Sequence, residues 1–338
     1  MKWNSSELIK ATVHSVFLFI NIMVLILLLL PMLTTNMGAW WLDNLLNLQI
    51  QWSLLALLLI IINIFYIKQL RVISILMFST LISINLLPLY VSDSSATTPL
   101  LMTQTDNNQL NIAQINLRYD NPNLAQLLPV LGNKSYDLLI IQEASDEKHQ
   151  LIKQLTDYYP YHFGISKRHA TPDGMAIFSR SPIIENKLHH LGGQHGHLLE
   201  VILQKQGLTA PIQLFALHPV SPRNAQLWQT RNETLAILSD IVVASPFTHK
   251  LVVGDFNSSP WSVQFKNFQR TSQLKSSASG FGYIASWSYS DKPILSLLSS
   301  VYIDHHLVSA PFNVVNKRPL PIQGSDHQLI LTELQVSN

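Results

Sequence analysis

The sequence contains no cysteine and few charged residues. Among its 338 residues there is no Cys, and Asp, Glu, Lys and Arg together account for only 12%. The absence of cysteine excludes disulfides, thiolate metal sites and a cysteine nucleophile, although it does not identify the compartment. The formal net charge of +2 also gives no reason to expect strong attraction to a polyanion. Functions that depend on thiol chemistry are therefore excluded.

The shortage of charge is concentrated before residue 92. Hydrophobic residues make up 47% of the chain, and three apolar runs, at about 13–33, 48–67 and 71–91, have the length that crosses a bilayer. Three such runs in close succession favour transmembrane helices over buried helices of a soluble protein. A cleaved signal peptide is an alternative for the first run alone, but no clear small-x-small cleavage site follows it.

The basic residues around these runs predict the orientation of the chain. Lys2 and Lys10 precede the first run, and Lys68 and Arg71 separate the second from the third. The loop between the first two runs contains no Lys or Arg. By the positive-inside rule, the N-terminus is cytoplasmic and everything after residue 91 lies in the periplasm or the extracellular space. The sequence therefore predicts a multi-pass inner-membrane protein, with the lipid bilayer as a partner.

The pattern changes after the third run. Residues 92–109 are rich in Ser, Thr, Asn and Asp and are predicted to be a linker. The catalytic domain is predicted to occupy 110–338, where short apolar runs alternate with helical patterns. Strands are predicted at 110–117, 137–141, 175–179, 212–217, 251–253, 301–303 and 328–334, helices at 146–158 and 225–243, and an irregular serine-rich region at 272–300.

A polar residue follows most of the predicted strands. These polar residues are Asn116, Glu143, His218, Asp255 with Asn257, Asp304, and the pair Asp326 and His327. Because strand ends in one sheet lie together, these side chains can converge in one cleft. Carboxylates suit a hard divalent cation, and a histidine can transfer a proton near neutral pH. Each residue alone also has an ordinary alternative, such as a turn cap for Asn116, a solvated acid for Glu143 or a core histidine for His218.

The order of these motifs resembles that of the endonuclease/exonuclease/phosphatase superfamily, which includes DNase I, abasic-site endonucleases, bacterial sphingomyelinases and inositol-phosphate phosphatases. The three-run anchor resembles a membrane-anchored bacterial subgroup that includes the teicoplanin-resistance protein of actinomycetes. The resemblance implies an α/β fold of the α+β type, a four-layer α/β/β/α sandwich, here preceded by three transmembrane helices. It also implies Mg²⁺ as cofactor, with Mn²⁺ as the alternative.

The resemblance further implies a role for each site residue. Glu143 would be the principal metal ligand, assisted by Asn116 and Asp326. Asp255 would orient or deprotonate the attacking water, Asn257 would hold that water or a phosphoryl oxygen, and His218 would contact the phosphoryl group and protonate the leaving oxygen. Asp304 would bind His327, which either stabilises the transition state or acts as the base. Which histidine is the acid and which is the base stays open.

Three positions leave alternatives open. Arg223 is a candidate for binding the substrate phosphate, although Arg223 and Arg231 are also compatible with a solvated helix face. Family members related to DNase have a glutamate behind the residue equivalent to His218, and Asp173 is the nearest candidate here. The histidines between 189 and 197 suggest either a second metal site or a glycine-rich loop, and their spacing favours the loop.

Three functions are compatible with these features. The first is a membrane-anchored hydrolase that cleaves a phosphodiester or pyrophosphate of a lipid-linked or membrane-proximal substrate by metal-assisted attack of water. The second is a surface-tethered nuclease, which is less favoured because residues 110–338 contain 18 Lys and Arg against 16 Asp and Glu, without a basic run. The third is a non-catalytic membrane scaffold. No protein partner is predicted.

Overall fold

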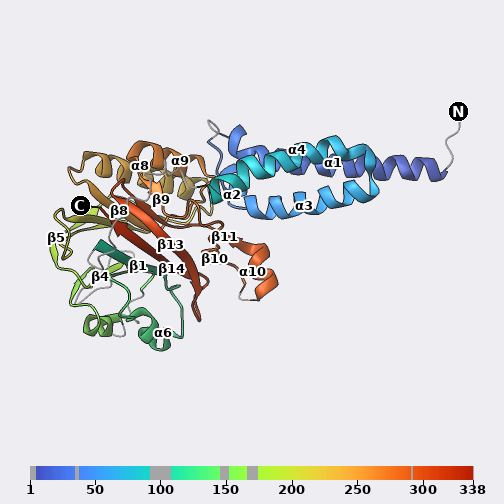
Figure 1. Ribbon diagram of the computed structural model, residues 1–338. Helices are drawn as coiled ribbons and strands as arrows, with labels where there is room; N and C mark the ends of the chain where they lie inside the picture. The colour runs from blue at the N-terminus through green and yellow to red at the C-terminus, as the bar shows by residue number, and fades with distance from the viewer. Residues whose placement is uncertain are drawn as a thin grey trace.

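The computed structural model describes residues 5–34, 38–91, 108–144, 152–165, 174–290 and 292–337. A bundle of N-terminal helices projects from one end of a sandwich of two sheets (Figure 1). Asp173, most of the predicted linker and the first six residues of the predicted helix 146–158 lie outside the described residues. The described end of that predicted helix forms a short 3₁₀ turn, η5 (Gln154–Asp157).

Three of the N-terminal helical segments are long and apolar enough to cross a membrane. They are α1 (Ser5–Leu33), α3 (Gln49–Tyr66) and a composite of η1 (Lys68–Leu70), α4 (Arg71–Thr80), η2 (Leu81–Leu86) and α5 (Leu87–Tyr90). Asn63 Nδ2 donates to Asn21 Oδ1 at 2.7 Å and to Ser74 Oγ at 2.9 Å, which ties the three segments together. Such interhelical hydrogen bonds stabilise helix packing where water is excluded.

A short helix that the sequence analysis did not predict, α2 (Trp40–Leu46), connects α1 to α3. It contacts α8 (Ala225–Ala244) of the sandwich. The seven residues of α2 are too few for a periodic pattern to stand out, and its position therefore depends on tertiary contacts.

The two sheets confirm the predicted α/β sandwich. The first has the order β13 (Phe312–Pro321), β14 (Gln328–Val336), β1 (Gln109–Asn116), β2 (Leu138–Gln142), β4 (Ala176–Ser179) and β3 (Tyr161–Phe163). The second has the order β5 (Ile183–His190), β6 (His197–Leu203), β7 (Ile212–Leu217), β8 (His249–Asp255), β12 (Asp304–Val308) and β9 (Lys275–Ser276). Both are mixed, because β1–β2 and β7–β8 are parallel pairs and the other described pairs are antiparallel.

Helices cover the outer face of each sheet. The helix α6 (Leu124–Leu131) packs on the first sheet, whereas α8 and α9 (Val263–Ser272) pack on the second. The region predicted to be irregular, 272–300, contains β9, the start of β11 (Ser300–Val301), β10 (Trp287–Ser288) and α10 (Pro293–Ser299). The four layers place the main apolar core between the two sheets.

Several strands depart from the sequence prediction. The predicted strand 301–303 is wrong in its bounds, because β11 ends at Val301 and β12 begins at Asp304. The strands β5 and β13 were not predicted because both are edge strands with many polar residues, and β13 also contains two prolines. Edge strands tolerate both features since one side of each needs no hydrogen-bonding partner.

Candidate active site

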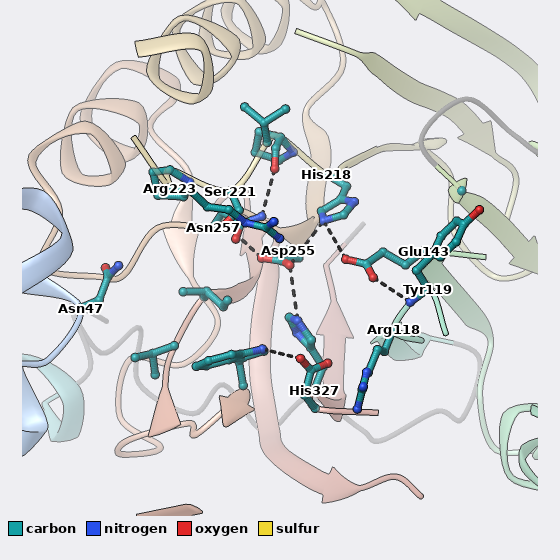
Figure 2. Close-up of a pocket in the computed structure, with 18 of the residues that line it drawn as sticks. Asn47, Arg118, Tyr119, Glu143, His218, Ser221, Arg223, Asp255, Asn257 and His327 are labelled. Carbon is teal, nitrogen blue, oxygen red and sulfur yellow. Dashed lines mark hydrogen bonds and ion pairs between the residues drawn. The ribbon is translucent and has the colours of Figure 1, made fainter. Parts of the chain in front are cut away.

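A pocket of about 1020 Å³ opens at the end of the sandwich nearest the helical bundle. It is lined by the segments that follow β1, β2, β7 and β8, by residues near β12 and β14, and by three residues of the helical bundle (Figure 2). The predicted site residues on the pocket wall are Glu143, His218, Arg223, Asp255, Asn257, Asp326 and His327. The predicted convergence of strand ends therefore occurs, although the role of each residue stays a prediction.

Alternation along the strands aims several of these side chains into the seam between the sheets. In β1, Ile112 packs in the core between the sheets, and Asn116 follows in the same phase. In β8, Val253 packs in that core, and Asp255 follows two residues later. Because side chains two apart on a strand face the same way, the inter-sheet core continues directly into the polar site.

The turns at the pocket use unusual backbone conformations. Four non-glycine residues of the described chain have positive φ, and three of them line the pocket: Arg118 (59°), Glu143 (55°) and Asn257 (48°). Left-handed backbone is costly for residues with a side chain, and it often marks functional sites. At Glu143 this turn ends β2 and brings the carboxylate toward Asn116 and His218.

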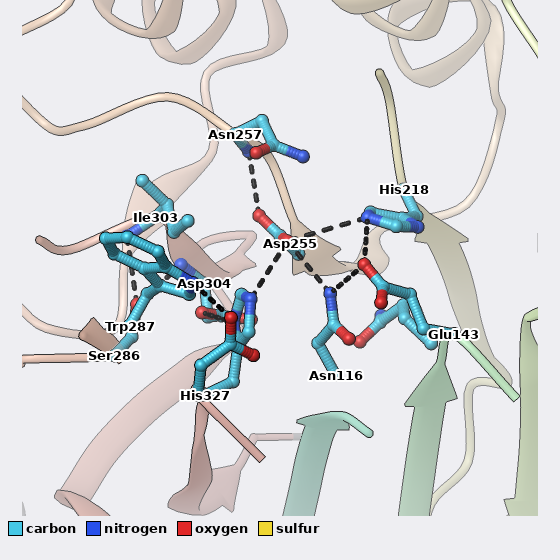
Figure 3. A network of polar contacts seen from close by, with 12 residues as sticks. Asn116, Glu143, His218, Asp255, Asn257, Ser286, Trp287, Ile303, Asp304 and His327 are labelled. Carbon is cyan, nitrogen blue, oxygen red and sulfur yellow. Dashed lines mark hydrogen bonds and ion pairs between the residues drawn. The ribbon is translucent and has the colours of Figure 1, made fainter. Parts of the chain in front are cut away.

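Asp255 lies at the centre of the polar network (Figure 3). Its Oδ1 accepts a hydrogen bond from the backbone N–H of Asn257 at 2.9 Å. Its Oδ2 accepts from Asn116 Nδ2 at 3.2 Å and lies 3.5 Å from His218 Nε2 and 3.7 Å from His327 Nε2. This buried carboxylate is thus placed between two imidazoles.

Glu143 is held from two sides but stays open to the pocket. Asn116 Nδ2 donates to its Oε1 and the backbone N–H of Tyr119 donates to its Oε2, both at 2.9 Å. The N–H of Arg118 donates to Asn116 Oδ1 at 3.0 Å, which fixes the Asn116 amide with its nitrogen toward the two carboxylates. The Glu143 side chain is 31% exposed, and its Oε1 lies 3.7 Å from His218 Nε2.

A second buried carboxylate orients His327. Asp304 Oδ2 accepts from His327 Nδ1 at 2.8 Å, and Asp304 Oδ1 accepts from Gln114 Nε2 at 2.7 Å. This arrangement leaves His327 Nε2 facing Asp255 and the pocket. Gln114 was missed from the sequence, although its position two residues before Asn116 on the same strand face was a usable signal.

Opposite charges inside the network shift the pKa values of its members. Burial lowers the pKa of His327, but the carboxylates of Asp304 and Asp255 outweigh it and raise that pKa to about 9. Burial also works against ionisation of Asp255, yet the hydrogen bond to His218 and the charge of His327 lower its pKa to about 2. The pKa of His218 is raised, because Asp255 and Glu143 overcome the effect of burial. For Asp304 burial prevails and raises the pKa against the pull of His327.

The donor set fits a hard divalent cation beside Glu143. Within the described part of the chain, Asp255, Asp304 and His327 offer ligand atoms within 4.8 Å of one another. However, the Asp304 side chain is fully buried, and its Oδ2 is bound to His327 Nδ1. The half-open carboxylate of Glu143 is better suited, because Mg²⁺ binds few protein carboxylates and keeps several waters.

Two further predicted residues lie on the pocket wall in specific settings. Asp326 Oδ2 accepts a hydrogen bond from Trp287 Nε1 at 2.9 Å, and Trp287 was not predicted from the sequence. Arg223 is exposed at the rim of the pocket, where it can reach a bound anion. The roles of Asn116 and Asp326 as metal ligands stay predictions.

Arg231 contradicts the interpretation as a solvated residue. Its side chain is fully buried, and its guanidinium donates to Asp43 of α2 and, at 2.7 Å, to the carbonyl oxygen of Asn257. A solvated helix face was the wrong prediction for Arg231: the residue is in phase with the buried Leu235 and Leu238 of α8, and Asp43 of α2 supplies its counter-charge. The Asn257 side chain donates to the Pro219 carbonyl at 3.0 Å and so joins the two loops that carry His218 and Asp255.

The histidines between 189 and 197 have other partners. His189 Nε2 lies 2.5 Å from Glu200 Oε2 on the neighbouring strand, and His190 packs edge-on against His197. These residues belong to β5, β6 and the turn between them, so the favoured interpretation as a glycine-containing loop describes only the turn. His305, next to Asp304, is fully buried among aromatic rings, and burial lowers its pKa to about 3.

Comparisons with solved structures agree with this architecture. The crystal structure of D. rerio TDP2 complexed with single-strand DNA product matches with a TM-score of 0.56 and 18% identity, covering 67% of this chain and 98% of that one. An endonuclease/exonuclease/phosphatase family protein from Bacteroides thetaiotaomicron matches with a TM-score of 0.55 and 15% identity, covering 68% and 98%. A third, from Beutenbergia cavernae, has a TM-score of 0.52 and 17% identity, covering 68% and 72%. At these identities the likeness establishes the fold alone.

Sequence comparison assigns the family. A search of curated protein sequences finds no match, so the resemblance to the teicoplanin-resistance subgroup is not confirmed. A family model, by contrast, matches residues 111–327, which include all the predicted site residues. The chain belongs to the Endonuclease/Exonuclease/phosphatase family.

Proposed function

We propose that this protein is a membrane-anchored hydrolase that cleaves a phosphodiester or pyrophosphate bond of a lipid-linked or membrane-proximal substrate, using a divalent cation. Members of its family are generally hydrolases of phosphoester bonds. The observation that carries the proposal is that Glu143, His218, Asp255 and His327 face one pocket, although they lie at the ends of four different strands. The three apolar N-terminal helices support the membrane-proximal part of the proposal.

The side chains divide the chemistry among them. Asp255, ionised and close to two imidazoles, is placed to orient the attacking water or to accept its proton. His218 is placed to give a proton to the leaving oxygen. His327, held at Nδ1 by Asp304, directs its Nε2–H toward the phosphoryl oxygens.

Glu143, with the pocket carboxylates beside it, would hold the cation, Mg²⁺ or alternatively Mn²⁺. When bound, the cation supplies charge neutralisation for the phosphoryl oxygens. Asn116 supports Glu143 and Asp255 together through its amide nitrogen, which keeps the two carboxylates at a fixed separation. Arg223 at the rim is suited to bind an outer oxygen of the substrate.

The orientation in the membrane forms part of the proposal. Lys2, Lys10, Lys68 and Arg71 support a cytoplasmic N-terminus and an inner-membrane location, with the sandwich on the periplasmic or extracellular side. A C-terminal alkaline phosphatase fusion should be active in whole cells, and a C-terminal fluorescent-protein fusion should be dark. Bright fluorescence with inactive phosphatase would overturn this orientation.

A tethered nuclease is the second candidate. The fold is similar to that of D. rerio TDP2 in complex with single-strand DNA product. Arg118 and Arg223 also line the pocket, where they can contact backbone phosphates. Against it, the sandwich lacks the excess of basic residues that non-specific nucleic-acid binding usually requires.

One assay separates these candidates. The full chain in lipid nanodiscs is incubated with Mg²⁺ and, in turn, with sphingomyelin, an isoprenoid pyrophosphate and plasmid DNA. Glu143→Gln serves as the inactive variant, and Glu185→Gln, at an exposed position on β5, removes the same charge away from the site. We expect hydrolysis of a lipid substrate that Glu143→Gln abolishes and Glu185→Gln preserves. Cleavage of DNA alone would favour the nuclease, and no Glu143-dependent activity on any substrate would favour a non-catalytic scaffold.

A further inference from the structure

The helical bundle packs directly on the catalytic end of the sandwich. An apolar cluster crosses the boundary, in which Leu46 of α2 and Leu89 of α5 meet Trp261 and, at its edge, Tyr283. The backbone N–H groups of Gly280 and Gly282 both donate to the Leu89 carbonyl at 3.0 Å. In Figure 1 the helices meet the sandwich beside α8 and the β10–β11 ribbon. The bundle is therefore docked on the sandwich.

The docked segments of the sandwich are those that carry site residues. Among the hydrogen bonds that cross the boundary are those from Asn44 Nδ2 to the Pro222 carbonyl (3.0 Å), from Ser259 Oγ to the Leu46 carbonyl (3.4 Å) and from Gln51 Nε2 to the Ser300 carbonyl (2.6 Å). Pro222 and Ser259 follow the site residues His218 and Asp255 closely in the chain, and Ser300 precedes Asp304. A shift of the bundle would consequently move three parts of the site at once.

The strongest polar link across this boundary is a buried ion pair. Arg231 of α8 is fully buried and donates to Asp43 Oδ2 of α2. Trp228 Nε1 donates to the same oxygen at 3.1 Å. A buried guanidinium without a counter-charge would cost several kcal/mol. Asp43 is therefore required for Arg231 to stay where it is.

Arg231 in turn holds the loop that carries the central carboxylate. Its Nη1 donates to the Asn257 carbonyl at 2.7 Å. Asn257 adopts left-handed backbone, and its N–H donates to Asp255 Oδ1 at 2.9 Å. A strained turn of this kind needs support from its surroundings, and a chain of three contacts thus runs from Asp43 to Asp255.

The same part of the bundle also forms a wall of the pocket. Asn44, Asn47 and Leu48 line it together with the catalytic side chains. Figure 2 shows Asn47 on the side of the pocket opposite Glu143. A substrate bound in the pocket beside Glu143 and His218 consequently faces residues of the membrane anchor.

We propose that the connection between α1 and α3, residues 40–48 with the helix α2, is a component of the active site. Within it, Asp43 is a positioning residue that acts on Asp255 through Arg231. This inference rests on the proposed hydrolase function. It adds that the anchor shapes the site itself, in addition to holding it at the membrane. The sandwich without its anchor would then lack one pocket wall and the support of the Asp255–Asn257 turn.

Kinetics of charge variants test the positioning role. In nanodiscs, Asp43→Asn should lower kcat about 100-fold, the size of loss expected when a catalytic group is misplaced by about 1 Å, with KM changed much less. Glu7→Gln, which removes an exposed acid at the far end of α1, should match the wild type. The double variant Asp43→Asn/Arg231→Met removes both charges of the buried ion pair. It therefore tests whether a lower kcat in Asp43→Asn results only from misfolding caused by an unpaired buried charge. It should still show the lowered kcat, and its loss should be smaller than the product of the two single losses.

Hydrogen exchange provides a readout that needs no substrate. Amides of the 255–262 segment should exchange faster in Asp43→Asn than in the wild type or Glu7→Gln. An unchanged kcat in the folded double variant, or unchanged exchange in 255–262, would overturn the inference while leaving the hydrolase proposal intact. If the wild type shows no Glu143-dependent hydrolysis, the hydrolase proposal fails, and the exchange experiment alone decides whether Asp43 supports the turn.

Discussion

The buried lysine at position 317 should make the stability of the sandwich depend strongly on pH. Lys317 extends from the edge strand β13 and is only 4% exposed, and its Nζ donates to Ser277 Oγ at 2.8 Å. Burial lowers the pKa of Lys317 from 10.5 to about 7, against the attraction of Asp304. The perturbation that exposes this effect is Lys317→Met, which keeps the length of the apolar stem and removes the charge.

The direction of the pH dependence follows from the pKa values of Lys317 in the folded and unfolded chain. Between about pH 7 and 10.5 the unfolded chain carries the proton on Lys317 and the folded chain does not, so stability rises with pH across this window. At about 1.4 kcal/mol per pH unit the full difference is on the order of 5 kcal/mol. In the Lys317→Met variant, loss of the hydrogen bond to Ser277 would offset about 1 kcal/mol of this gain in stability.

Thermal unfolding in detergent, followed by tryptophan fluorescence at pH 7 and pH 10, measures this difference. At pH 7 the Lys317→Met variant should melt roughly 10 °C above the wild type, since about 4 kcal/mol corresponds to that shift in a domain of this size. By pH 10 most of the gap should close. Lys187→Met makes the same change at an exposed position on β5 and should leave Tm unaltered at both pH values. A gap between variant and wild type that is equal at pH 7 and pH 10 would show that Lys317 is not neutral in the fold.

Three further predictions concern the site and its scaffold. Asp304→Asn should lower kcat about 100-fold with little change in Tm, because the new amide cannot accept hydrogen bonds from both Gln114 and His327. A kcat within about threefold of the wild type would contradict the proposed orientation of His327. Gly254→Ala should destabilise the sandwich by about 3 kcal/mol or more, because the new Cβ would lie 2.0 Å from the Leu217 carbonyl oxygen. In the control variant Gly38→Ala, the new Cβ makes an ordinary contact at 3.6 Å, and Tm should not change. Removal of divalent cations with EDTA should abolish hydrolysis, and Mg²⁺ or Mn²⁺ should restore it in the wild type but not in Glu143→Gln; activity that survives EDTA would refute the metal requirement.

Much of the candidate site could be predicted from local patterns. The predicted strand 251–253 places Asp255 in phase with Val253 of the inter-sheet core, and the same holds for Asn116 after Ile112. The period-2 alternation of a strand is a local property, so it is visible in the sequence. Gln114 follows the same rule and was missed only because it lies inside the strand instead of at its end.

Other features could not be predicted because they depend on edges and on packing. The polar strands β5 and β13 lack a continuous apolar run, since an edge strand needs burial on fewer sides. Arg231 is in phase with the apolar residues Leu235 and Leu238 of α8, but its counter-charge could not be predicted, because Asp43 comes from α2, far away in the sequence. Whether a charged residue is solvated or paired depends on what covers it, which no local pattern records.

By itself the sequence determined three apolar runs of membrane-spanning length and the order and phase of the residues that follow each strand. Chain-local periodicity and length are enough for these features, because each depends on neighbours a few positions away. Tertiary structure alone decided that Asp43 meets Arg231, that Asn47 faces the pocket and that Lys317 is enclosed. Each of these depends on surfaces that come together from distant parts of the chain, and it is that packing which places the N-terminal helical bundle at one wall of the pocket.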